Sequence, residues 1–149
     1  MNPWHRTYCV LLCLAGLLPV GCGDSDASQV PLHRTSGMIT FGGKPLAGAI
    51  IMFHAVKRSS TTTDDPLPVP GATSQEDGSF SVSTFDPEDG MPEGEYYITV
   101  SCEDRSGGRQ NDDDYPELLP TRYQNPATSG LKVKIVAGDN ELKPLELFP

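Results

Sequence analysis

Short runs of alternating apolar and polar residues, separated by turn residues, dominate the chain from residue 36 onward. Every second side chain is apolar in residues 95–102, and the same period of two recurs in 79–84 and 131–135. This period places alternate side chains on opposite faces of a β-strand, so one face of each strand is expected to be buried. No long stretch has the 3.6-residue period of an amphipathic helix. The pattern predicts an all-β domain.

Turn residues divide this region into about seven strands, which is typical of a β-sandwich. The pairs Gly42-Gly43 and Asp77-Gly78 predict tight turns. The first of these turns is expected to join the first two strands as a hairpin, and the most regular strand, 95–102, is expected to lie in the centre of a sheet. The predicted strands are residues 38–41, 49–56, 71–74, 79–84, 95–102, 131–135 and 142–148.

The first 21 residues have the anatomy of a secretory signal peptide. Arg6 is the only charged residue before Cys22, and residues 9–20 form an uncharged apolar run that is too short to span a membrane as a helix. Residues 17–22, Leu-Leu-Pro-Val-Gly-Cys, resemble the lipobox of bacterial lipoproteins, which implies cleavage after residue 21 and diacylation of Cys22. Pro19 departs from the leucine usual in that motif, so a secreted, unlipidated protein is the alternative.

Residues 23–34 are mostly small and polar, a composition typical of a flexible linker. The predicted organisation is therefore a signal peptide over residues 1–21, a lipidated Cys22 with a tether over 22–35, and a domain over 36–149. The protein is expected to be exported and held in the cell envelope by its lipid, with the membrane as its first partner.

Composition agrees with a turn-rich β protein, because the chain contains 15 glycines and 14 prolines. The net charge is −9, and loss of Arg6 with the signal peptide makes the remainder more acidic. Such a surface repels phosphate backbones, so no nucleic acid partner is expected.

Cysteine positions argue against a disulfide framework. Cys9 and Cys13 lie in the predicted signal peptide and Cys22 at the anchor, which leaves Cys102 in the domain. Cys102 follows the alternation of its strand and is interpreted as a small buried apolar residue. A reactive thiol and a disulfide between Cys22 and Cys102 are the alternatives.

No catalytic residues, metal site or cofactor are predicted. His33 lies in the tether and His54 at a strand end, with no histidine or cysteine at metal-ligand spacing. Acidic clusters in loops are interpreted as solvated charge. The alternative is weak calcium binding, for which Asp112, Asp113 and Asp114 are the best candidates. The acidic clusters lie at residues 64–65, 86–89 and 112–114.

The stretch between residues 103 and 130 has little pattern and is longer than a passive connection, so it is a candidate functional element. Tyr115, Arg122 and Tyr123 could stack on a sugar or anchor a protein. The alternative is that Tyr123 and the pair Leu118-Leu119 fix the loop onto the sandwich, which would keep apolar surface from solvent.

Three runs carry a family resemblance: SGMITFGGKPLAGA at residues 36–49, a segment at 73–80 ending in EDGSF, and PEGEYYITV at 92–100. They resemble the carboxypeptidase regulatory-like domain, and segments 119–123 and 126–131 resemble small bacterial lipoproteins that carry this domain alone. The resemblance covers residues 36–148. It implies a seven-stranded Greek-key sandwich of the transthyretin type, and it concerns the accessory domain rather than the enzyme.

The sequence thus predicts a non-enzymatic binding or scaffold module at a membrane surface, with an envelope protein or a polysaccharide as partner. The alternative is a transthyretin-like hydrolase of a small molecule. Enzymes of that type resemble one another in histidines and a terminal Tyr-Arg-Gly-Ser, whereas this chain ends in Glu-Leu-Phe-Pro.

Overall fold

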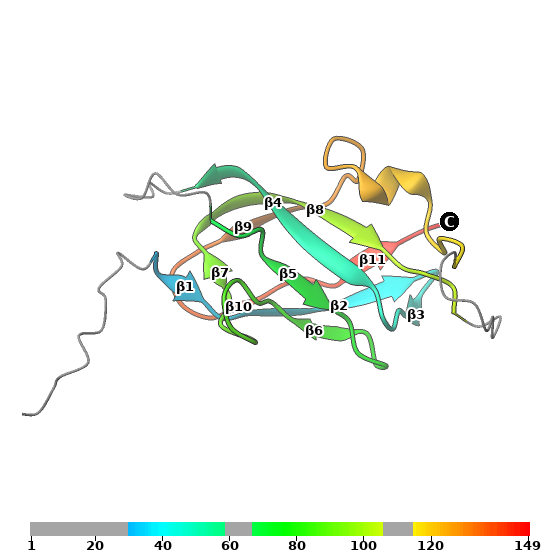
Figure 1. Cartoon of the computed structure of the whole chain (residues 1–149), viewed down its shortest axis with the longest axis horizontal. Helices are drawn as coiled ribbons and strands as arrows, with labels where there is room; N and C mark the ends of the chain where they lie inside the picture. The colour runs from blue at the N-terminus through cyan, green and yellow to red at the C-terminus, as the bar shows by residue number, and fades with distance from the viewer. Residues whose placement is uncertain (1–29, 59–66, 106–114) are drawn as a thin grey trace, which may run out of the picture.

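The structure, a computed structural model, describes residues 30–58, 67–105 and 115–149. A five-stranded and a four-stranded β-sheet pack face to face (Figure 1), and a separate two-stranded sheet and one short 3-10 helix, η1 (Thr121–Gln124), complete the described part. The predicted all-β sandwich is confirmed. None of the helices in this described part is long and apolar enough to cross a membrane.

The first sheet is built around β2 (Thr35–Phe41). One edge of β2 pairs in antiparallel fashion with β6 (Ser79–Ser81) and β3 (Lys44–Pro45). The other edge pairs in parallel with β10 (Asn140–Glu141) and β11 (Leu145–Leu147). Three residues separate β10 from β11, so this edge is interrupted opposite the middle of β2.

The second sheet has the order β5-β4-β8-β9. The long apolar strand β4 (Ile50–Arg58) lies between β5 (Gly71–Thr73) and β8 (Gly94–Ser101), and β9 (Lys132–Ile135) pairs with the far edge of β8. Strand β8 is therefore interior to its sheet, as predicted for residues 95–102. The eleven strands of the described residues exceed the predicted seven because several strands are interrupted or only two residues long.

Alternate residues of the two sheets form the core between them. Phe53 on β4 and Tyr96 and Ile98 on β8 are fully buried, and Ile39 and Leu147 face them from the first sheet. Tyr96 buries its ring and donates a hydrogen bond from its hydroxyl to the Pro92 carbonyl, at 2.9 Å. The polar end of this tyrosine is thus satisfied inside the core.

The predicted hairpin between residues 38–41 and 49–56 is wrong. The Gly42-Gly43 turn has φ values of 57° and 79° and returns the chain into β3, which pairs with β2 over two residues only. The chain then crosses to the other sheet. The first four residues of β4 are all apolar, and the second sheet provides this strand with a neighbour on each side.

The predicted tether extends too far toward the domain. Its last residues form β1 (Leu32–His33), which pairs with β7 (Met91–Pro92), and Thr35 is buried at the start of β2. His33 Nδ1 accepts a hydrogen bond from the Gly138 N–H at 3.1 Å. A strand of two residues has no alternation to detect, which is why composition alone placed these residues in a linker.

The two sides of the sandwich differ. On one side, Gly71 of β5 and Ser83 exchange backbone hydrogen bonds of 3.0 and 2.9 Å, which link the two sheets. On the other side, β9 ends the second sheet and β10 and β11 lie along the edge of the first. Within the described residues no ladder joins β9 to β10 or β11, so this side of the sandwich is open.

Candidate functional site

Arg122 and Tyr123 lie together on η1, and their side chains contact the backbone at the end of the described chain. Tyr123 is 5% exposed, and its hydroxyl accepts a hydrogen bond from the Phe148 N–H at 2.9 Å. The Arg122 guanidinium lies 4.7 Å from the centre of the Tyr123 ring and donates to the Pro149 carbonyl at 3.0 Å. Burial raises the pKa of Tyr123, but the Phe148 backbone and Arg122 outweigh it, so the pKa is lowered. The prediction that Tyr123 fixes the loop is confirmed.

Tyr115, the third predicted ligand-contact residue, has a different partner. Tyr115 packs against Arg105, whose guanidinium is 5.5 Å from the ring centre, and Arg105 also pairs with Glu103 at 3.0 Å. The calcium candidates Asp112, Asp113 and Asp114, and the predicted lipidation residue Cys22, lie outside the described residues.

Hydrogen bonds to backbone groups hold the segment after β8 in place. Leu118 donates to the Cys102 carbonyl and Asp104 to the Pro116 carbonyl, each at 2.8 Å. The Glu117 carboxylate accepts hydrogen bonds from the N–H groups of Cys102 (2.7 Å) and Leu119 (3.1 Å). Leu119 is buried, which confirms half of the predicted leucine anchor, but Leu118 is 41% exposed and that half was wrong.

Cys102 is 4% exposed, and its Sγ lies 3.6 Å from the Ala47 carbonyl oxygen. Burial raises the pKa of this thiol, and the charges of Glu117 and nearby Asp104 and Glu103 raise it further. A raised pKa disfavours the thiolate, which is the reactive form. The prediction of a small buried residue is confirmed.

Two polar side chains that the sequence analysis considered for metal binding, His54 and Asp89, have partners within the fold. His54 lies in the middle of β4 rather than at a strand end, and its Nε2 is 2.8 Å from the Thr99 hydroxyl. The Asp89 carboxylate accepts hydrogen bonds from the N–H groups of Thr84, Phe85 and Asp86 at 2.7, 2.9 and 2.8 Å. In the described ranges, His, Cys, Asp and Glu side chains form no group of three that could hold a metal ion.

The open side of the sandwich contains a groove of about 580 Å³, which we call the β9 groove. Its floor is formed by half-buried apolar side chains that pack against the core, and its rim is charged. The floor residues are Leu131, Val133, Leu142 and Leu145; the charged rim residues are Lys132, Lys134, Lys143, Asp139 and Glu141. The groove therefore combines partly covered apolar surface with charge.

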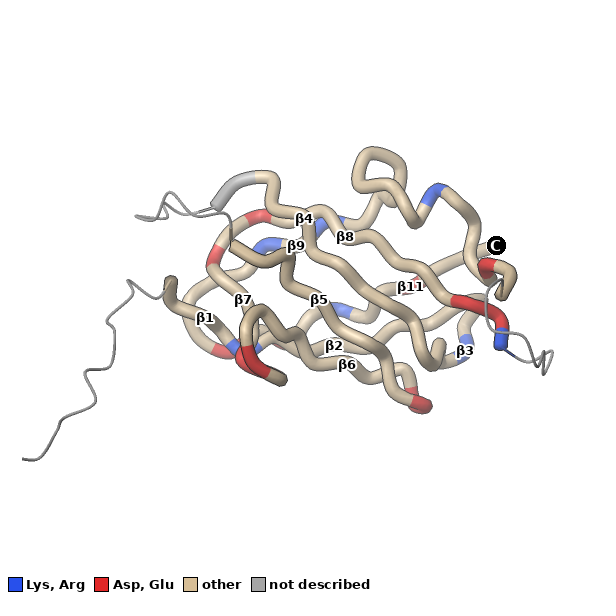
Figure 2. Tube along the Cα trace, in the orientation of Figure 1, with Lys and Arg blue, Asp and Glu red and all other residues tan. Residues whose placement is uncertain are grey.

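Three of the five lysines of the chain line the β9 groove, although the protein is acidic overall. Figure 2 shows basic residues beside β9 and β11, while acidic residues lie mostly in loops and turns. Lys132 pairs with Glu95 at 3.1 Å and lies 5.7 Å from the centre of the Tyr97 ring. Lys134 and Lys143 are exposed and form no ion pair within the described residues.

The backbone of β9 also faces this groove. Lys132 lies opposite Tyr97 and Val133 opposite Tyr96, and the Ile98 N–H donates to the Leu131 carbonyl at 3.0 Å. Hydrogen-bonded pairs alternate along an antiparallel ladder, so Val133 continues the bonding to β8 and the N–H and C=O groups of Lys132 and Lys134 point away from it. Within the part of the chain that the structure describes, the groove thus offers a strand edge that pairs with no other strand.

Sequence reasoning missed the groove, because its two walls belong to different sheets. Residues 130–134 lie near residues 139–145 only in the folded sandwich. The signal that was visible is the alternation of lysine with Val133 and Ile135 in an otherwise acidic chain. Lysine on such a strand is typical of a sheet edge.

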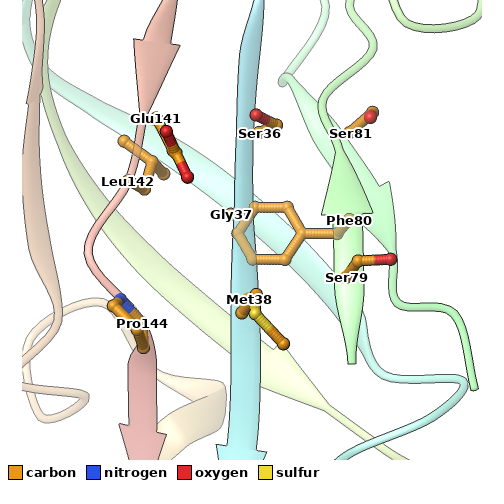
Figure 3. Close-up of a pocket in the computed structure, with 9 residues that line it drawn as sticks. All are labelled: Ser36, Gly37, Met38, Ser79, Phe80, Ser81, Glu141, Leu142 and Pro144. Atoms are coloured by element: carbon orange, nitrogen blue, oxygen red, sulfur yellow. The ribbon is translucent and has the colours of Figure 1, made fainter. Parts of the chain in front are cut away.

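A smaller hollow of about 320 Å³ lies over β2, between β6 and the β10 edge. Figure 3 shows the Phe80 side chain reaching from β6 across Gly37, with Leu142 on the far side of β2. Serine hydroxyls and Met38 line this hollow, and Glu141 is the one charged residue among those that line it.

No protein-family model matches the chain, and no curated protein matches it. A DUF3823 family protein from Parabacteroides merdae ATCC 43184 is similar in structure, with 17% identity and a TM-score of 0.37 over 81% of this chain and 48% of that protein. A 9R-lipoxygenase from Cyanothece PCC8801 has 18% identity and a TM-score of 0.40 over 78% of this chain and 16% of that enzyme. The chain spans about half the length of the first and under a fifth of the second. Likenesses of this size carry no argument about function.

Proposed function

We propose that the chain is an exported bacterial lipoprotein, anchored by Cys22, whose sandwich is a carboxypeptidase regulatory-like binding module at a membrane surface. The signal-peptide pattern of residues 1–21 and the lipobox-like residues 17–22 support export and acylation. The structured domain includes β1 from Leu32, ten positions after Cys22. A link of that length spans at most about 35 Å, so the module would work close to the lipid surface.

The β9 groove is the observation that carries the binding role. It combines a half-buried apolar floor, exposed lysines and an unpaired strand edge, and these features together are typical of a site for a partner rather than of closed protein surface. Other polar groups considered as chemical candidates have partners within the fold: Cys102, His54 and Asp89 each contact named backbone or side-chain groups.

The anchor is tested by intact mass and detergent partition of the full chain, expressed in a bacterium with lipoprotein processing. Wild type is expected to gain the mass of a diacylglyceryl group at Cys22, to lose residues 1–21 and to enter the detergent phase. Cys22→Ser is expected to stay in the aqueous phase. Cys102→Ala is the matched control, because it removes the thiol of the domain and should leave acylation unchanged.

Equal partition of wild type and Cys22→Ser into the aqueous phase would refute the lipid anchor. A cleaved but unmodified wild type would then identify a secreted, unlipidated binding domain. An acyl group on Cys102 would contradict the placement of the anchor.

A further inference from the structure

We propose that the β9 groove binds an extended acidic segment of a partner protein, which adds to the β5-β4-β8-β9 sheet as a strand beside β9. The segment carries acidic side chains at alternate positions and apolar side chains between them. This proposal deepens the proposed binding role and rests on it, but it does not depend on whether Cys22 is acylated.

The backbone of β9 determines the form of the partner. The outward N–H and C=O groups of Lys132 and Lys134 are spaced to pair with every second residue of another strand. An extended peptide added to a sheet edge gains its affinity from such main-chain bonds and its specificity from pockets for alternate side chains. A helix or a compact ligand would leave these groups unpaired.

The rim determines the charge of the partner. Lys132 and Lys134 lie on the outer face of the sheet, opposite Tyr97 and Glu95, and Lys143 lies on the other wall of the groove. Alternate residues of an added strand would lie next to Lys132 and Lys134, where opposite charges stabilise a cross-strand pair. The acids of the groove, Asp139 and Glu141, lie at and beside β10 rather than on β9.

The same lysines argue against a second copy of this chain as the occupant. Two β9 strands paired about a two-fold axis would place Lys132 and Lys134 of one copy beside those of the other. Like charges directly opposite are destabilising, and lysine at an edge is a known guard against self-pairing. The charge of β9 therefore excludes its own copy and admits an acidic strand.

The floor of the groove determines which side chains the partner carries between its acidic residues. Side chains of an added strand that face inward would enter the open side of the sandwich between β9 and the β10–β11 edge. There they would cover Val133 and Leu131 on one wall and Leu142 and Leu145 on the other, all of which are half-buried. Small or medium apolar side chains such as valine fit this position, because they cover apolar surface without displacing the core.

The test is titration of the full chain with a capped peptide of sequence Glu-Val-Glu-Val-Glu-Val-Glu, followed by calorimetry and backbone amide exchange. The acidic peptide is expected to bind and to slow exchange of the Lys132 and Lys134 amides at least about fivefold, since an added strand protects the N–H groups it pairs with. A peptide with lysine in place of glutamate is expected to bind at least about tenfold more weakly.

Charge-reversal variants locate the site. Lys134→Glu and Lys143→Glu are each expected to weaken binding of the acidic peptide about fivefold, because each replaces an attraction with a repulsion at an exposed position. Lys44→Glu is the matched control, because Lys44 is an exposed lysine on β3, outside the groove. It should leave the affinity unchanged. All three residues are exposed, and thermal melting of each variant checks that it is folded.

Three outcomes overturn the proposal: equal binding of the acidic and basic peptides, equal weakening by Lys44→Glu, or binding without protection of the β9 amides. Absence of binding overturns it as well. A dimer in sedimentation whose formation slows exchange of the Lys132 and Lys134 amides would identify a second copy as the occupant instead. None of these results bears on acylation of Cys22, which partition measures separately.

Discussion

Phe80 on β6 lies directly opposite Gly37 on β2, and its ring occupies the space that a side chain at residue 37 would need. A Cβ atom built on Gly37 would come within 2.7 Å of Phe80 Cζ and 3.2 Å of the Leu142 Cβ (Figure 3). Phe80 is 2% exposed, so its ring has little room to move. The absence of a side chain at Gly37 therefore allows the large Phe80 ring to pack against β2 in the core.

Replacing Gly37 with alanine is expected to destabilise the protein through this contact. The added methyl group must displace a buried ring, and overpacking of this kind costs about 1–3 kcal/mol. Urea denaturation should show a lower midpoint with an unchanged slope. Ser36→Ala is the neighbouring control on the exposed face of β2 and should change stability by less than about 0.5 kcal/mol.

A double-mutant cycle separates the cost of the clash with Phe80 from any effect of Gly37→Ala on the backbone itself. Phe80→Leu alone should destabilise by removal of buried surface, but Gly37→Ala should cost much less in that background because the ring is gone. Additive effects of the two substitutions would contradict the contact as the cause.

Loss of the Tyr123 hydroxyl is expected to loosen the contact between η1 and the end of the described chain. Tyr123→Phe keeps the buried ring but removes the acceptor for the Phe148 N–H. The expected cost is about 1 kcal/mol, with faster amide exchange at Phe148. Tyr97→Phe is the control, because Tyr97 is 38% exposed on the outer face of the second sheet. Unchanged exchange at Phe148 in Tyr123→Phe would refute this role of the hydroxyl.

The strands with regular alternation were predictable from the sequence because their pattern is local. Residues 95–102 have an apolar side chain at every second position, and the corresponding strand β8 buries Tyr96, Ile98 and Val100. The burial of Cys102 followed from the same phase. The Gly42-Gly43 turn was also predictable, since both residues need positive φ.

Pairings between distant segments were not predictable in this way. The parallel pairing of β2 with β11 joins Ile39 to Leu145, and nothing in either segment specifies the other. The β9 groove has the same origin, because its two walls belong to different sheets. Likewise, the contact that holds Tyr123 is made with Phe148, 25 residues away. Side chains that seemed available for a ligand in the sequence are therefore used inside the fold.

The Asp89 carboxylate is expected to contribute stability that depends on pH. Burial raises the pKa of Asp89, but hydrogen bonds from the N–H groups of Asp86, Thr84 and Phe85 outweigh it, so the pKa lies below its ordinary value of 3.8. A lowered pKa in the folded state means that the contribution is present above the unfolded pKa and is lost as pH falls through the folded pKa.

Comparison of Asp89→Asn with wild type isolates this contribution. The amide retains one acceptor oxygen, and the loop is partly solvated, so the variant should lose about 1 kcal/mol at pH 7. The difference in unfolding free energy should shrink as pH is lowered from about 4 to below the folded pKa. A difference that stays constant over this range would show that the charge of Asp89 contributes nothing.

Substitution of Gly90, which lies against the backbone of His33, is expected to displace strand β1. Its φ is 90°, and a Cβ atom there would lie 2.1 Å from the His33 carbonyl oxygen and 2.7 Å from the Arg34 nitrogen. Both contacts are with backbone, so a rotamer change cannot relieve them. Gly90→Ala should therefore push β1 away from β7 and cost more than about 2 kcal/mol, with faster amide exchange across residues 32–35.

Gly43→Ala is the matched control for backbone strain, because its φ is 79° and a Cβ atom there would meet nothing within 4 Å. It should cost about 1 kcal/mol, the usual penalty for a positive φ, and should leave exchange of residues 32–35 unchanged. Equal costs for the two variants would mean that strain alone accounts for Gly90. A larger cost for Gly90→Ala, confined in its exchange effects to β1 and β7, would show that the pairing of these strands needs the close backbone approach of Gly90 to His33, which only glycine permits.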